Sequence, residues 1–108
     1  YEAYFSKAQK VRRLIRDFLD QLFEEYDFLI LPTTPDTAWS IGQQGNDPTK
    51  AYLADVYTVL ANLAGIPAIS IPLGKGDDGM PFGIQFIANR FEEQKLFSFS
   101  SHFQSLTR

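Results

Sequence analysis

An isolated carboxylate is the clearest candidate for chemistry in this sequence. Asp55 lies in a stretch from Ala51 to Gly74 that contains no Lys, Arg or Glu. Thr58 and Asn62 follow it by three and seven residues, so on a helix the three side chains would form one polar stripe. A lone carboxylate is costly to bury unless it is paired or meets a ligand cation. The spacing alone favours the plainer alternative, the exposed stripe of an amphipathic helix.

The single histidine does not indicate a catalytic triad. His102 has Ser98, Ser100, Ser101 and Ser105 near it in sequence. A serine nucleophile needs a histidine base that is itself oriented by an acid, whereas serines at this spacing on a helix form a polar face. One histidine without cysteine would leave only carboxylates as further zinc ligands, so we expect no metal site.

Two other groupings are better explained as solvated surface. Ser6 and Lys10 lie one helical turn apart, but a Ser-Lys pair needs a buried lysine of lowered pKa, and this lysine belongs to a cationic stripe. Glu24, Glu25 and Asp27 cluster at the end of the first predicted helix. Paired carboxylates act as acid and base only where their environments differ, and nothing in the sequence indicates such a difference.

Composition narrows the possible classes of protein. The chain has 108 residues, a net charge of −3 and no cysteine. The acidic balance argues against a nucleic-acid surface, and the absence of cysteine excludes disulfides and fits the cytosol. No apolar run reaches the ~18 residues that span a bilayer, so we expect no membrane contact. The glycines of residues 74–79 are not followed by the Lys-Ser/Thr pair and helix of a phosphate-binding loop.

Hydrophobic periodicity predicts the elements that must position Asp55. Apolar residues at steps of three and four predict a helix from the start of the chain to Tyr26. The same spacing predicts a second helix, which begins at an Asp47 N-cap and ends at Gly65 in the left-handed conformation. Short apolar runs predict strands at residues 27–31, 66–71 and 82–88, and a last helix follows to Leu106. We expect an α/β fold, a small mixed sheet of about three strands packed with three helices. The first two strands would form a parallel pair, and the last two a hairpin.

The segment Asp55–Pro72 resembles the late conserved block of amidase-signature enzymes, which reads D-x-Y-T-x-x-x-N-L-A-G-x-P-x-x-S-x-P. Three more stretches agree in order and spacing. They are residues 6–12 (the family's preceding helix), residues 31–35 (its Leu-Pro-Thr-Thr-Pro strand exit) and residues 80–87 (its G-x-P-x-G-x-Q-x-I strand). The resemblance covers nearly the whole chain and implies the C-terminal part of the amidase-signature fold.

Within that family, Asp47-Pro48 followed by Tyr52 resembles the A subunits of glutamyl-tRNA(Gln) amidotransferases. This resemblance implies a subunit that hydrolyses glutamine and supplies ammonia for converting Glu-tRNA(Gln) to Gln-tRNA(Gln) in the cytoplasm. Partner B and C subunits would hold the ATP and magnesium, and tRNA would be bound only through the complex. By the same resemblance, Asp55 matches the aspartate that holds the α-amino group of glutamine.

The family's catalytic serines and lysine belong to a Gly/Ser-rich signature that no part of this chain matches. We therefore assign no catalytic residue and expect no amidase activity from residues 1–108 alone. Because the chain starts at Tyr1 without Met, we expect an excised single fragment with exposed apolar surface and an unpaired strand edge.

Two alternative functions remain open at this point. Leu60, Ile66 and Lys50 depart from the residues usual in the A subunits. These departures are compatible with a stand-alone amidase that acts on another small or lipidic amide. The third possibility is a non-catalytic binding or structural module that inherited only this part of the fold.

Overall fold

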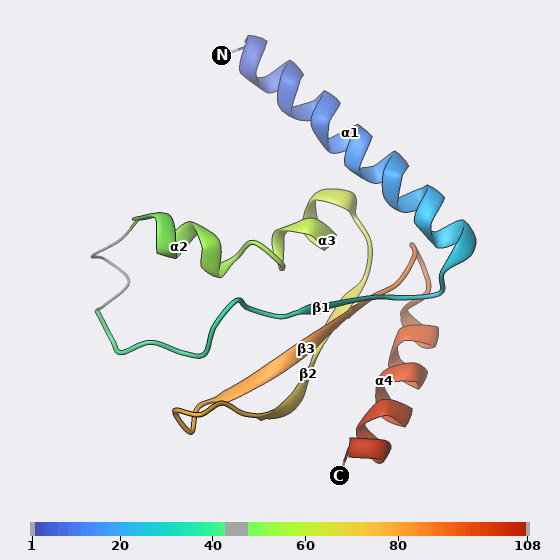
Figure 1. The fold of residues 1–108 in the computed structure, drawn as a ribbon. Coiled ribbons are helices and arrows are strands. Elements are labelled where there is room, and N and C mark those ends of the chain that lie inside the picture. The colour runs from blue at the N-terminus through green and yellow to red at the C-terminus, as the bar shows by residue number, and fades with distance from the viewer. Residues whose placement is uncertain (1, 43–47, 108) are drawn as a thin grey trace.

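The computed structural model describes residues 2–42 and 48–107. Within them, the elements follow in the order α1 (Glu2–Glu25), β1 (Leu29–Pro32), α2 (Pro48–Ala54), α3 (Val59–Ala64), β2 (Ala68–Lys75), β3 (Pro81–Ile87) and α4 (Glu93–Thr107), as Figure 1 shows. The first and last predicted helices and all three strands are confirmed to within a few residues. None of these helices combines the length and hydropathy that crossing a membrane requires.

The middle strand of the sheet is β3, and the strand order is β1-β3-β2. Both neighbours run antiparallel to β3, so the predicted hairpin of β2 and β3 is confirmed. The predicted parallel pair of residues 27–31 and 66–71 is wrong, because β3 lies between these strands and the described sheet is antiparallel rather than mixed. The physical reason is burial: Phe86, Ile87 and the adjoining Ala88 have no exposed surface, which suits a central position.

Successive residues of β3 point to opposite faces of the sheet, where they belong to two different hydrophobic cores. Ile87 packs with Leu19 of α1 and Ala61 of α3 on one face of the sheet. Phe86 lies in the core on the other face, where its ring meets Phe99 of α4 edge-on, with centroids 4.9 Å apart. The chain therefore forms three layers, with α1 and α3 on one side of the sheet and α4 on the other.

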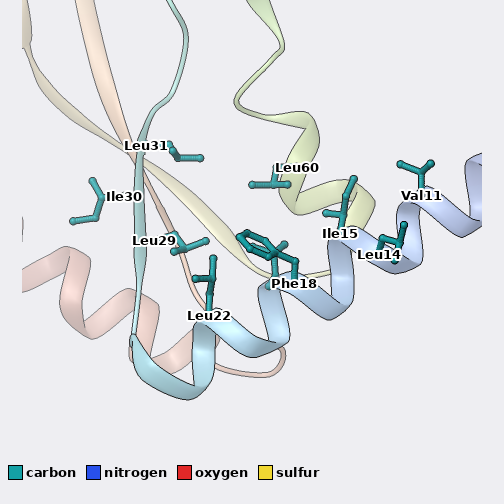
Figure 2. Close-up of a pocket in the computed structure, with 10 residues that line it drawn as sticks. Val11, Leu14, Ile15, Phe18, Leu22, Leu29, Ile30, Leu31 and Leu60 are labelled. Atoms are coloured by element: carbon teal, nitrogen blue, oxygen red, sulfur yellow. The ribbon is translucent and has the colours of Figure 1, made fainter.

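The apolar face of α1 is only partly covered. Leu19 is the buried residue of this helix, whereas Leu14 and Phe18 keep 67% and 59% of their surface exposed. Figure 2 shows Phe18 near Leu29 of β1 and Leu60 of α3, and together with Leu14 these side chains line an apolar groove of about 520 Å³. The expected exposed apolar surface is thus confirmed, and it adjoins β1 at an edge of the sheet.

The predicted middle helix is two helices, α2 and α3, separated by the turn from Asp55 to Thr58. The amides of Asp55, Val56 and Thr58 bond carbonyls three residues back, which is tighter than α-helical spacing. Because the turn contains neither Gly nor Pro, periodicity could not reveal this break. Gly65 ends α3 at φ +70°, as predicted, while the predicted N-cap Asp47 lies outside the described residues.

The sheet leaves no room for a side chain at Gly83 of β3. The hydroxyls of Thr33 and Ser70 are joined by a 2.7 Å hydrogen bond close to this glycine. A Cβ atom on Gly83 would lie 2.9 Å from the Ser70 Oγ and 3.0 Å from the Ile71 carbonyl oxygen. The close approach of the neighbouring strand therefore requires glycine here.

We expect Gly83→Ala to lower the free energy of unfolding by about 1–3 kcal/mol, because backbone atoms must move to admit the methyl group. Gly74→Ala is the matched control in β2. Its Cβ would meet the Phe82 ring at 3.7 Å, an ordinary contact, so stability should change by less than about 1 kcal/mol. Urea unfolding followed by circular dichroism measures both variants, and equal stabilities would contradict the packing argument.

Candidate substrate-binding site

A cavity of about 810 Å³ lies between the α2–α3 region and the segment that follows β1. This volume is within the range of small-molecule sites, about 300–1,000 Å³. One wall consists of α2 residues and Asp55, another of the segment 34–39, and Pro81 of β3 completes the lining. The lining residues are Thr34, Pro35, Asp36, Thr37, Ala38, Trp39, Ala51, Leu53, Ala54, Asp55 and Pro81.

The charged side chains that line this cavity are two carboxylates, Asp36 and Asp55. Among the described lining residues there is no Lys or Arg to neutralise them. A cavity lined by charge of one sign attracts ligand groups of the opposite sign. The site is therefore suited to a small molecule that carries a positive charge and some apolar surface.

The predicted polar stripe is only partly retained. The Thr58 hydroxyl donates to the Asp55 carbonyl oxygen at 3.2 Å, and the Asn62 amide donates to the Thr58 carbonyl oxygen at 3.2 Å. These two side chains therefore stabilise the backbone around the turn. Of the three predicted residues, only Asp55 is among those that line the cavity.

Hydrogen bonds fix the shape of the segment 34–39. The Thr34 hydroxyl donates to the Asp36 carbonyl oxygen at 2.7 Å, and the Thr37 amide donates to the Asp36 carboxylate at 2.8 Å. The Thr37 hydroxyl donates to the carboxylate of Asp78 in the β2–β3 turn. Sequence reasoning assigned this segment only as a loop. The available signal was the Thr-Pro-Asp-Thr series, since Asp commonly bonds the backbone just after it in turns.

The other clusters considered from the sequence do not assemble a site. Ser6 and Lys10 are exposed on α1, and His102 is exposed on α4. Asp27 pairs with Lys95, with Oδ1 and Nζ 2.7 Å apart. Across residues 2–42 and 48–107, no three His, Asp or Glu side chains are grouped so that they could hold a metal ion.

Comparison with known proteins identifies the family. Residues 1–97 match the family model described as Amidase. The chain belongs to the amidase family. The resemblance inferred from the Asp55–Pro72 block is therefore confirmed.

Named amidase relatives match nearly all of this chain. The A subunit of glutamyl-tRNA(Gln) amidotransferase from Azotobacter vinelandii is 49% identical over 99% of the chain and 22% of its own length. The crystal structure of the corresponding protein from Thermotoga maritima matches with a TM-score of 0.85 and 49% identity, over 90% of the chain and 21% of that protein. The 6-aminohexanoate cyclic dimer hydrolase structure matches with a TM-score of 0.79 and 25% identity, over 99% of the chain and 24% of that enzyme. The chain thus spans about a fifth of the length of the A subunits it matches.

Asp78 connects the cavity segment of this amidase-family chain to the β2–β3 turn. The Thr37 hydroxyl, followed by the Met80 amide, lowers the pKa of the Asp78 carboxyl. Both donors favour the charged carboxylate. Their stabilising effect is therefore fully present above the ordinary aspartate pKa and is lost as the pH falls through the lowered pKa. At neutral pH the connection is intact.

We expect Thr37→Val to raise the pKa of Asp78 toward its ordinary value, because valine keeps the shape of threonine without its donor. Thr34→Val is the matched control, since the Thr34 hydroxyl bonds Asp36 instead, and it should leave the Asp78 titration unchanged. A ¹³C NMR titration of the Asp78 carboxyl measures both. The same Asp78 pKa in Thr37→Val and in the unsubstituted chain would disprove the connection.

Proposed function

We propose that this chain is part of the glutamine-hydrolysing subunit of a tRNA-dependent amidotransferase. In this role it contributes one wall of the substrate cleft, and the released ammonia serves to convert Glu-tRNA(Gln) to Gln-tRNA(Gln). The observation that carries the proposal is the position of Asp55 in a cavity whose described lining has no cation. The 49% identity to A subunits over almost the whole chain supports the same substrate.

Asp55 binds the α-ammonium group of glutamine in this proposal. An ammonium–carboxylate hydrogen bond is charge-assisted and contributes about 1.5–3 kcal/mol. Asp36 adds a second negative charge to the cavity, and Pro35, Trp39 and Leu53 provide apolar surface for the two methylene groups of glutamine. Amino group and aliphatic chain are thus both recognised by residues of this chain.

The bond-breaking step belongs to residues outside this chain. The resemblance assigns hydrolysis of the glutamine amide to two serines and a lysine that no position here matches, so the chain binds and orients the substrate. B and C subunits, with ATP and magnesium at the partner site, complete the proposed complex in the cytoplasm. With a net charge of −3, this chain is not the part that holds tRNA.

In the complete subunit, Asp55→Asn should raise the KM for glutamine about 10- to 100-fold, because the neutral amide loses the charge-assisted bond to the ammonium group. The value of kcat should change much less. Asp77→Asn, on the exposed β2–β3 turn, is the control with the same loss of charge. Steady-state glutaminase assays give both constants, and an unchanged KM in Asp55→Asn would refute the assigned role.

A tagged complete subunit should co-purify with its B and C subunits from its own cells. This result is expected because the proposed role is to supply ammonia to a partner that uses it. Recovery of neither partner from cells that express both would instead favour a stand-alone amidase. The similarity of fold to 6-aminohexanoate cyclic dimer hydrolase makes that the second candidate function.

A further inference from the structure

Gln85 is a buried polar residue in the central strand. It is 4% exposed and lies between Leu31 of β1 and Ser70 of β2 in the strand register. Its side-chain Nε2 donates a 2.9 Å hydrogen bond to the backbone carbonyl oxygen of Tyr57, 28 residues away in sequence. Since a buried amide without a partner is costly, this bond strongly constrains where Tyr57 lies.

Tyr57 is in the turn that carries Asp55. The N-terminal side of this turn is closed locally, because the Asp55 carbonyl oxygen accepts bonds from the amides of Thr58 and Val59 at 3.1 and 3.2 Å. The C-terminal side is bonded instead to the sheet through Gln85. Gln85 thus connects the Asp55 turn directly to β3, the most buried strand.

The turn depends on such a contact because its flanking helices are short. α2 has 7 residues and α3 has 6, and isolated helices of this length are not stable in water. Asp55 itself is exposed, so its own packing cannot fix its position. The bond from a rigid strand to the carbonyl of Tyr57, two residues away, can hold the backbone that carries Asp55.

We propose that Gln85 is a positioning residue, which holds the Asp55 turn in the orientation that binds substrate through its bond to the Tyr57 carbonyl. This inference rests on the proposed function of Asp55. By this inference Gln85 contributes to substrate affinity although it is not among the residues that line the cavity. Gln85 acts only through Asp55, so its contribution requires the positive charge on the substrate.

The experiment compares Gln85→Met, Asp55→Asn and the double variant in the complete subunit. Methionine has a similar shape but cannot donate, so Gln85→Met should raise the KM for glutamine about 3- to 10-fold with a smaller change in kcat. In the double variant, Gln85→Met should add no further increase, because the contact it positions is already lost. With 4-carbamoylbutanoate, which is glutamine without its amino group, Gln85→Met should leave kcat/KM unchanged.

Phe86→Leu is the control for loss of stability. Phe86 is the next residue of β3, fully buried on the opposite face of the sheet, so its substitution should lower the thermal midpoint without raising KM. If Gln85→Met does not fold, Gln85→Asn is the second variant. Its side chain is one methylene group shorter, which moves the amide donor away from the Tyr57 carbonyl, so the same changes in KM are expected.

The outcomes separate this inference from the function on which it rests. An unchanged KM in Asp55→Asn overturns both. A raised KM in Asp55→Asn together with an unchanged KM in Gln85→Met overturns the positioning role alone. Independent, multiplying effects in the double variant, or an equal loss with 4-carbamoylbutanoate, also overturn it.

Discussion

The structure depends on one strand that is buried on both faces. Phe86 and Ile87 are adjacent in β3 and have no exposed surface, yet they belong to different cores. Because successive side chains of a strand point to opposite faces, this pair fixes which elements lie on which side of the sheet. β1 and β2 must then be the neighbours of β3, and the candidate site forms beyond them, where β1 leads into the segment 34–39.

The same burial sets the chemistry that β3 can carry. A polar residue in this strand needs a partner, and Gln85 finds it in the carbonyl of Tyr57. The central strand is thus connected to the turn that presents Asp55 to the cavity. On the other wall, Asp78 is bonded to Thr37. Side chains of β3 and of the β2–β3 turn therefore hold both sides of the site.

The features of the fold that could be predicted from the sequence are those that depend on residues close together in the chain. The amphipathic helices, the hairpin and the left-handed Gly65 follow from local periodicity and backbone preference. The position of β1 beside β3 did not, because pairing across more than fifty residues is decided by burial that no local pattern contains. Asp55 was notable for its isolation from other charges, but spacing alone favoured an exposed polar stripe, and its binding role was taken from the family resemblance. The break before Val59 was not predicted, because the turn contains neither Gly nor Pro. The contact of residues 34–39 with the β2–β3 turn was not predicted either, because the Thr37–Asp78 bond joins residues that are far apart in the sequence.

The partly covered α1 has a consequence for the cooperativity of the fold. Its 24 residues place one side chain, Leu19, in a buried position, whereas the end of β3 is inaccessible to solvent. Local opening is easiest where few apolar contacts are lost. The first turns of α1, whose side chains are exposed from Glu2 to Leu14, therefore open more readily than the part that packs around Leu19.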